Sequence, residues 1–418
     1  MILFLYQLFL ALGFLFYLPK LLFRKKSGPT LKDRFGLIPK EFQKSGSTLI
    51  WIHAVSLGET KAIAPLARML KEHYGSEVQF VVSSGTATGR AEVKKAIPFC
   101  DFSLYLPLDF SWIMKPLVSR LKPDLVLISE TDLWMNFLTQ CKKQGARCFI
   151  VNGKLSERSC HRYESVPFWC HRLFSQFDHI GAQSQHYKDR YLRLGIPEER
   201  ISVTGNLKLD HVHPPSPDLQ EWKESLGFSE TDQILVLGST HDPEERWFLE
   251  LLDGLWNVMP ELKVVLVPRH PERFEVVAEL LGECGQPFKR YSCPSDAPFR
   301  ILLVDAMGVL KKCYQISDVS LVAGSYVDKV GGHNILEPSE YGKPVIFGPC
   351  MATQPELLEL CLAYEAGLQV PMQDLSETLK SLFNQSERRE QLGQNGIRLI
   401  QDHRGATQRT FDLIFSTL

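Results

Sequence analysis

The hydrophobic positions of this chain fall into two successive series of short apolar runs that alternate with helical patterns. In the first half the runs lie at residues 48–55, 78–83, 125–129, 148–151 and 179–182, and they are rich in β-branched residues. In the second half they lie at residues 233–238, 262–268, 300–304, 319–323 and 344–347. Short, nearly continuous apolar runs between helices predict parallel strands that are covered on both faces. We therefore predict an α/β fold with two doubly wound, Rossmann-like sheets.

A proline-rich segment, HVHPPSP, separates the two series and begins at residue 211. Because proline cannot continue a helix or a central strand, we interpret residues 211–218 as a linker. The predicted domains are then residues 27–210 and residues 219–418, a division that the length of 418 residues also favours. Ligands are expected at the carboxyl ends of the strands, in a cleft that the two domains face. The last helix, around residues 405–418, could belong to either domain.

The amino terminus departs from this globular pattern. Residues 2–18 are nearly all apolar, Gln7 is the only strongly polar exception, and basic residues follow at Lys20, Arg24, Lys25 and Lys26. This pattern predicts a membrane anchor over residues 1–26 and places the rest of the chain on the cytoplasmic side. The run is short for a span, so the apolar core of a signal peptide and a helix lying in the membrane interface remain alternatives. All three place the chain beside lipid.

Composition and charge narrow the classes of partner. Hydrophobic residues make up 44% of the chain and charged residues 23%, as in globular proteins, and the net charge of −1 gives no reason to expect nucleic acid. The ten cysteines form no CxxC pair and no Cys/His cluster at metal-ligand spacing. We therefore predict reduced thiols in the cytosol and no metal site.

The stretch GSYVDKVGGHNILEPSEYGKPVIFGP, residues 324–349, is the most informative part of the chain. Gly331 and Gly332 allow the backbone to approach a ligand closely, and a helix is predicted to begin near Asn334. On its first turn Glu337 could accept hydrogen bonds from two ribose hydroxyls while helix-end amides face a phosphate. An ordinary N-cap with a capping carboxylate has the same spacing. Because another strand follows at once in βαβ order, we interpret the stretch as a nucleotide-sugar site.

Candidate catalytic residues follow the strands of the first half. After a tight turn at Ser56 and Gly58, Glu59 enters a helix that is predicted to continue to about Lys71. This carboxylate could remove a proton from an attacking hydroxyl if burial raises its pKa, or it could be a helix-start glutamate that only satisfies backbone amides. Glu130 is a second candidate carboxylate, and it directly follows the strand predicted at 125–129.

Cations of the first half provide further candidates. Lys154 and Arg158 follow the strand at 148–151, together with Glu157, and Lys208 lies just before the linker. Lys208 could meet a leaving phosphate or stabilise developing charge. Surface ion pairing is the alternative for each of these residues.

Strand ends of the second half carry groups that suit a nucleotide. The turn at Ser239 and Thr240 offers hydroxyls and amides to a phosphate. Arg269 can pair with a phosphate or carboxylate through two hydrogen bonds, and Pro268 stiffens the segment before it. The backbone at Met307 and Gly308 could contact a pyrimidine edge. Each signal is weak by itself, but together they favour a donor site in this half.

Seven motifs occur in a fixed order behind the apolar amino terminus, namely SLGET, ISETDLW, VTGNLK, GSTH, PRHPER, MG and GGHNILEP. In this order they resemble the 3-deoxy-D-manno-octulosonic acid (Kdo) transferases of glycosyltransferase family 30, which build the inner core of lipopolysaccharide. The resemblance covers nearly the whole chain. It implies a two-domain GT-B fold, CMP-Kdo as donor, a lipid A precursor as acceptor, inversion at the transferred carbon, and no metal or other cofactor. It also implies a place on the cytoplasmic face of the bacterial inner membrane, among phospholipids.

The resemblance assigns roles residue by residue. Glu59 is implied as the proton acceptor, and Glu130 and Lys208 are implied as transition-state stabilisers. Contacts with CMP are implied at two strand ends and at the start of the predicted helix, at Pro268, Arg269, Met307, Gly308, Val309, Asn334, Ile335, Leu336 and Glu337.

The chain departs from the family pattern at a few positions. Val309 stands where a glutamate is expected, so that only a backbone contact can survive there. Asp132 and Met135 replace the usual glutamate and proline after Glu130, Gly153 and Lys154 replace Ala-Arg, and Cys350 stands where histidine is common. A GT-B enzyme with another nucleotide-sugar donor and a lipid acceptor, and a binding protein without turnover, are the alternatives. The number of Kdo residues added is left open.

Overall fold

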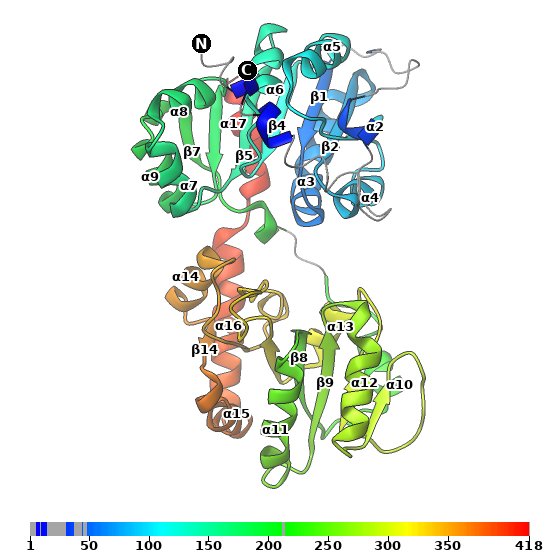
Figure 1. Ribbon diagram of the computed structural model, residues 1–418. Coiled ribbons are helices and arrows are strands. Elements are labelled where there is room, and N and C mark those ends of the chain that lie inside the picture. Colours follow the sequence, from blue (N-terminus) through cyan, green and yellow to red (C-terminus); the bar gives the residue numbers. More distant parts are fainter. Residues whose placement is uncertain are drawn as a thin grey trace. The chain divides into compact units, whose positions relative to one another are not determined.

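The protein is described by a computed structural model that covers residues 6–8, 10–14, 31–36, 44, 48–210 and 214–417 (Figure 1). The chain divides into two compact units. Unit 1 comprises residues 1–211 and 403–418, and unit 2 comprises residues 212–402. Residues 403–418 thus join unit 1, although the predicted second domain runs to residue 418. Within the predicted linker, residues 214–218 contain no helix or strand, and residues 211–213 lie outside the described residues.

Unit 1 is built on a parallel sheet of seven strands in the order β3-β2-β1-β4-β5-β6-β7. The strands are β1 (Thr48–His53), β2 (Val78–Ser84), β3 (Phe102–Tyr105), β4 (Leu125–Ser129), β5 (Arg147–Gly153), β6 (His179–Ala182) and β7 (Ile201–Val203). The helices are α2 (Leu31–Arg34), α3 (Leu57–Tyr74), α4 (Ala87–Ala96), α5 (Ser111–Leu121), α6 (Met135–Lys143), α7 (Glu157–Glu164), α8 (Pro167–Phe174), α9 (Gln185–Arg193) and α17 (Ala406–Thr417), with short 3-10 helices η1 (Gly75–Glu77), η2 (Glu198–Arg200) and η3 (Leu207–Asp210). The strand order reverses between β1 and β4, which makes this the switch point of the sheet.

The continuous apolar runs of the central strands are explained by two apolar clusters in unit 1. Trp51 and Val126 are neighbours in the sheet and belong to one cluster, whereas Ile50 and Leu125 belong to the other. Alternate residues of a strand point to opposite faces, so both faces must be apolar when helices cover both. Helix α17, red in Figure 1, packs against α3 and contributes the buried Ile414.

Unit 2 repeats the architecture with a second parallel sheet in the order β10-β11-β9-β8-β12-β13-β14. Its strands are β8 (Gln233–Thr240), β9 (Leu262–Pro268), β10 (Phe288–Arg290), β11 (Ile301–Leu303), β12 (Val319–Val322), β13 (Val345–Phe347) and β14 (Gly367–Gln369). Its helices are α10 (Leu219–Ser225), α11 (Glu244–Trp256), α12 (Phe274–Glu283), α13 (Leu310–Ile316), α14 (Pro355–Ala363), α15 (Leu375–Asn384) and α16 (Ser386–His403), with 3-10 helices η4 (Pro271–Arg273), η5 (Ser339–Tyr341) and η6 (Met372–Asp374). Here the switch point lies between β8 and β12.

Two parallel seven-stranded sheets confirm the predicted α/β class. All ten predicted strands are present, with ends that differ by at most two residues. The four strands without a prediction, β3, β7, β10 and β14, are the two edges of each sheet. The helix predicted near Asn334 was wrong: residues 335–338 form a turn, and only the 3-10 helix η5 follows before β13.

The described residues of the amino terminus form helical segments at 6–8 and 10–14. The Tyr6 hydroxyl donates a hydrogen bond of 2.7 Å to Asp109 Oδ2, and the Tyr6 ring lies 4.7 Å from that of Trp169. Leu8 and Leu12 remain half exposed. Among the residues that the structure describes, none of the helices is both long enough and apolar enough to pass through a bilayer. The membrane anchor predicted over residues 1–26, most of which lie outside the described residues, is not confirmed.

Candidate active site

The switch point of the first sheet brings together the carboxylates that follow β1 and β4. Glu59 lies in the first turn of α3, and Glu130 directly follows β4. Loops after the two central strands of a doubly wound sheet leave toward opposite faces, which opens space for a ligand between them. The negative charge of Glu130 reaches Glu59 and contributes to the pKa of its carboxyl group. The structure therefore brings the two predicted catalytic carboxylates into one electrostatic environment.

Glu59 forms a capping box with Ser56. The Ser56 side chain accepts a hydrogen bond from the Glu59 amide, and Glu59 accepts one from the Ser56 hydroxyl and another from the Val55 amide, both at 2.9 Å. The helix-start interpretation therefore describes its local contacts correctly. Burial, followed by the charge of Glu130, nevertheless raises the pKa of Glu59 above its ordinary value, although the two hydrogen bonds oppose the shift. Each oxygen keeps a lone pair for a further donor.

Glu130 has a left-handed backbone, with φ of 60°, and forms an ion pair with Lys208. Lys208 Nζ lies 2.7 Å from Glu130 Oε1, and the side chains are 36% and 18% exposed. A positive φ is rare for a residue with a Cβ and is often found where a side chain must point in a required direction. The two residues, predicted separately, thus form a half-buried ion pair, and the charge of Glu130 acts on Glu59.

The remaining candidates of unit 1 lie on the surface of neighbouring turns. Gly58 is exposed in the first turn of α3. Lys154, directly after β5, is half-buried, and Arg158 is exposed on α7. Their roles in binding a phosphate or an acceptor stay predictions.

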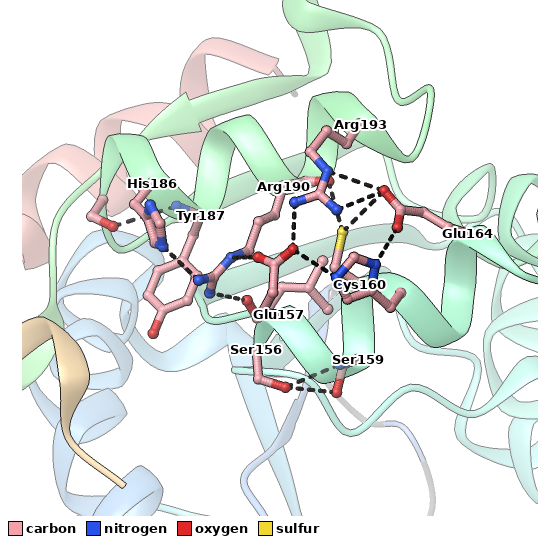
Figure 2. Close-up of polar contacts among 12 residues, drawn as sticks. Ser156, Glu157, Ser159, Cys160, Glu164, His186, Tyr187, Arg190 and Arg193 are labelled. Atoms are coloured by element: carbon pink, nitrogen blue, oxygen red, sulfur yellow. Dashed lines mark hydrogen bonds and ion pairs between the residues drawn. The ribbon is translucent and has the colours of Figure 1, made fainter. Parts of the chain in front are cut away.

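Glu157, which the sequence places beside them, is held in an ion-pair network between α7 and α9 (Figure 2). Its two carboxylate oxygens accept hydrogen bonds from Arg190 at 2.9 Å and from Arg193 at 2.6 Å. Arg193 also contacts Glu164, at 2.9 Å. Here the surface ion-pair alternative is correct, and Glu157 ties two helices together.

Sequence reasoning missed a buried histidine at the end of β1. His53 is 0% exposed; its Nδ1 lies 2.9 Å from Ser83 Oγ and its Nε2 lies 2.8 Å from Asp132 Oδ2. Burial raises the pKa of Asp132, but the hydrogen bonds from His53 and Trp134 outweigh this and hold it below its ordinary value. The pair fixes the segment that follows Glu130. Its signal in the sequence was the polar residue that ends an otherwise apolar strand.

In unit 2 the strand-end candidates after β8 and β9 are neighbours. Thr240 is paired with Pro268 in the sheet, and the Arg269 amide donates to the Thr240 carbonyl at 3.0 Å. Thr240 is fully buried, and Ser239 is nearly so, with φ of 60°. Arg269 is exposed beyond the strand. The guanidinium group is therefore the candidate of this group that is best placed to meet an anion.

The segment after β11 carries the next candidates. Met307 is 56% exposed, Gly308 has φ of 86°, and Val309 is the N-cap residue of α13. The backbone contacts with a ligand that were predicted at this turn stay a prediction.

Gly331 and Gly332 have positive φ values, of 73° and 89°. A Cβ at Gly331 would lie 2.8 Å from Thr353 Cγ2, and one at Gly332 would collide with the Met351 sulfur. Packing against residues 351–353 therefore requires these glycines, whether or not a ligand approaches.

The motif after these glycines turns rather than continuing as a helix. The Asn334 side chain accepts a hydrogen bond from the Leu336 amide at 3.1 Å, and Glu337 is half-buried. Ile335 and Leu336 are 0% and 2% exposed, so their side chains belong to the core. Only backbone atoms of these two residues are left as candidates for a ligand contact.

A second missed residue, the carboxylate Glu244, holds the start of the loop after β12 in place. It is 0% exposed and accepts hydrogen bonds from the amides of Gly324 at 2.8 Å, Tyr326 at 3.1 Å and His241 at 3.0 Å. Burial raises its pKa to about 7, although these hydrogen bonds lower it. Glu244 therefore joins the ends of β8 and β12 at the switch point of the second sheet.

A histidine pair lies beside Glu244. His241 Nε2 and His333 Nε2 are 2.8 Å apart, and the His270 ring lies 5.2 Å from that of His241. Burial, followed by His270 and Arg269, lowers the pKa of His241 to about 4, and burial followed by His241 lowers that of His333 to about 4. The GSTH and GGHN motifs contain these two histidines, but neither was predicted as a site residue.

Comparison with known proteins identifies the family. A family model described as 3-deoxy-D-manno-octulosonic-acid transferase (kdotransferase) matches residues 29–211. The 3-deoxy-D-manno-octulosonic acid transferase of Chlamydia trachomatis is 34% identical over 99% of this chain and 97% of its own length. The chain belongs to this family. This Kdo transferase is therefore a glycosyltransferase enzyme.

A solved structure agrees with the fold of this Kdo transferase. A glycosyltransferase from Rickettsia africae is 15% identical, covers 89% of this chain and 99% of its own, and has a TM-score of 0.61. At this identity the likeness shows the fold alone. The C-terminal CMP-Kdo binding domain of WaaA from Acinetobacter baumannii is 30% identical over 44% of this chain and 96% of its own, with a TM-score of 0.42.

Departures from the family pattern have local explanations in this transferase. The carboxylate of Asp132 reaches both His53 and Trp134. Met135 is fully buried as the first residue of α6, and the Cys350 thiol donates to Asp328 Oδ1 at 2.8 Å. Within the described ranges, no three or more His, Cys, Asp or Glu side chains gather as a metal site would require. The prediction of metal-independent transfer stays a prediction.

Proposed function

We propose that this transferase moves Kdo from CMP-Kdo to the 6'-hydroxyl of a lipid A precursor, with inversion and without a metal, in lipopolysaccharide inner-core biosynthesis. Membership of the family, at 34% identity over nearly the full length, supports the transferred sugar. The observation that carries the mechanism is the position of Glu59 next to the Glu130–Lys208 ion pair at the switch point of the first sheet.

In the proposed step the acceptor oxygen attacks the anomeric carbon of Kdo while the bond from that carbon to the phosphate oxygen of CMP breaks. The hydroxyl proton passes to Glu59, and the bonding electron pair leaves with CMP. A carboxylate with a raised pKa is suited to this task, because a base works best when its pKa lies near the operating pH. Glu130 and Lys208 stabilise the oxocarbenium-like charge and the leaving phosphate.

The donor is assigned to unit 2. Arg269 supplies a charge for the phosphate or the Kdo carboxylate, the backbone at Met307–Val309 binds cytosine, and Glu337 binds the ribose hydroxyls. Glu244 orients the loop from which Glu337 comes, because it holds the amides of Gly324 and Tyr326.

We also propose that the protein works at the cytoplasmic face of the inner membrane, where its acceptor lipid resides. Leu8 and Leu12 are each 50% exposed on a segment that Tyr6 fastens to Asp109. Exposed apolar residues on a docked segment favour a helix in the membrane interface, one of the alternatives considered from the sequence.

The proposal is tested by incubating the full-length protein with CMP-Kdo and a tetra-acylated lipid A precursor in mixed micelles, with and without EDTA. We expect a product heavier by one or more Kdo residues, and mass analysis counts the additions. UDP-sugars in place of CMP-Kdo serve as the donor control. Equal transfer from a UDP-sugar, or loss of transfer in EDTA, would contradict the proposal.

A further inference from the structure

An apolar pocket in unit 1 is lined in part by the segment that follows Glu130, and it has no assigned role. Its volume is about 680 Å³, and its walls come from the amino-terminal helical segment, the segment between β4 and α6, and helices α7 and α8. Residues that define it include Tyr6, Leu10, Trp134, Phe168, Trp169 and Leu173. Among the described residues that line it, none is charged.

The polar atoms of two aromatic walls already have partners inside unit 1. The Tyr6 hydroxyl donates to the buried carboxylate of Asp109, and Trp134 Nε1 donates to Asp132 at 2.9 Å. The two rings therefore present carbon atoms to the pocket. Against these two walls, hydrogen-bonding groups of a ligand would find no partners, whereas a hydrocarbon chain needs none.

Trp134 connects the pocket wall to the segment that follows β4 and contains Glu130. Trp134 follows Glu130 by four residues, and Asp132 between them hydrogen-bonds both Trp134 and His53 at the end of β1. On its outer side the pocket is bordered by exposed apolar residues, Val166 at 48% and Phe168 at 68%. Exposed apolar patches of this kind mark binding surfaces, and here the patch borders a pocket whose wall at Trp134 is four residues from Glu130 in the sequence.

We propose that this pocket binds one acyl chain of the acceptor lipid and thereby places the acceptor's sugar at Glu59 and Glu130. The inference rests on the proposed function, because it names how the same acceptor is recognised. The acyl chain positions the sugar hydroxyl, so the pocket discriminates an acylated acceptor from its deacylated sugar.

The test compares Val166→Asp with Val258→Asp, a matched change of an exposed valine that is 59% exposed in unit 2. Each full-length variant is assayed with the acylated precursor in micelles and with the same sugar after its acyl chains are removed. We expect Val166→Asp to lower kcat/KM for the acylated acceptor by about tenfold or more, an effect of the size that a hydrophobic pocket produces. Neither acceptor should respond to Val258→Asp, and the deacylated sugar should not respond to Val166→Asp.

Other outcomes separate the alternatives. Equal loss with both acceptors, or no loss with either, would overturn the acyl pocket. Val166→Asp could also weaken binding to phospholipid vesicles that lack the acceptor. A loss of vesicle binding as large as the loss of kcat/KM would overturn the acyl pocket and would make the surface a general membrane contact. If the unmodified protein transfers Kdo to neither acceptor, the proposed function itself fails.

A second measurement reports occupancy directly. An acceptor with brominated acyl chains should quench tryptophan fluorescence, and Trp169→Phe should reduce the quenching while Trp247→Phe, in unit 2, should not. Quenching that is unchanged in Trp169→Phe would contradict the inference.

Discussion

Each unit carries a glutamate near the start of the helix that follows its first strand, and the two glutamates have different surroundings. Among the described residues, Glu59 accepts hydrogen bonds from its own turn alone, at Val55 and Ser56. Glu244 accepts them from His241 and also from two amides of the loop after β12. The same position in the fold therefore serves a local cap in unit 1 and a connection between strand ends in unit 2.

Burial accounts for the rest of the difference. Glu244 is 0% exposed and accepts hydrogen bonds from three amides of the fold, whereas Glu59 is half-buried. A neighbouring glutamate raises the pKa of each, Glu245 that of Glu244 and Glu130 that of Glu59. A carboxylate whose partners are all internal holds structure, and one with accessible lone pairs can exchange a proton with a substrate. The neighbouring residues, rather than the position in the fold, therefore decide whether such a glutamate has a catalytic or a structural role.

The largest expected effect comes from Glu59→Gln. Removing the base should lower kcat by about 10²–10⁴-fold, because general base catalysis contributes an effect of that size. Gln can keep part of the cap, so thermal unfolding should change little. The measurement is the initial rate of Kdo transfer together with the binding of CMP, which should stay within a few-fold.

Glu157→Gln is the matched control, since Glu157 is also a helix-start glutamate of unit 1 but is engaged with Arg190 and Arg193 (Figure 2). It should leave the transfer rate unchanged. Near-normal turnover in Glu59→Gln would remove the base assignment.

The second effect concerns Glu244→Gln, which should destabilise the loop after β12. An amide cannot accept at both of its atoms, so one buried backbone donor loses its partner, at about 1–3 kcal/mol. Hydrogen exchange at the amides of Gly324 and Tyr326 measures this at pH 5. Glu272→Gln, an exposed glutamate of the same unit, is the control. Unchanged protection of both amides would contradict the assigned role.

The effect of Glu244→Gln on the free energy of unfolding should also depend on pH. The pKa of Glu244 is raised from 4.5 to about 7, so the native state binds its proton more tightly than the unfolded state does. The resulting stabilisation is complete below about pH 4.5 and is lost as the pH rises through about 7. The difference in stability between the wild type and Glu244→Gln should therefore shrink over this window. A stability difference that increases with pH would contradict a raised pKa of Glu244.

A smaller effect is expected from Gly332→Ala. This residue has φ of 89°, and an added methyl group would collide with Met351. Gly145→Ala is the control, since Gly145 has φ of 85° but no atom within 4 Å of a new Cβ. Both variants share the backbone strain, so Gly332→Ala should lose about 1 kcal/mol or more beyond the control, from overpacking alone. Equal losses in thermal unfolding would show that packing contributes nothing.

The sequence predicted what depends on continuous apolar runs. Central strands such as β4 are covered on both faces, so their sequences are unbroken apolar segments. In edge strands such as β7 only some residues are buried, so the sequence shows no such segment. The predicted helix at Asn334 failed because the chain forms a turn there, in which Asn334 accepts the Leu336 amide and Ile335 and Leu336 are buried.

Site residues were predictable to a similar degree. Glu59, Glu130 and Lys208 stand in motifs, and the structure brings them together. Glu244 and His53 were missed, because their roles arise from partners 80 and 79 positions away, namely Gly324 and Asp132. No local pattern reports such a contact.

The smallest predicted effect is a shift in the pH profile, and it tests how the first switch point sets the pKa of Glu59. The negative charge of Glu130 raises that pKa, so Glu130→Gln should move the acidic limb of kcat/KM to lower pH, measured on the residual activity. Lys208→Met removes the partner of Glu130 and leaves its charge uncompensated, which should move the limb to higher pH. Glu157→Gln should leave it in place. Shifts in the same direction for the first two variants would mean that they act through packing rather than through charge, and the comparison of the two glutamates would then rest on hydrogen bonding alone.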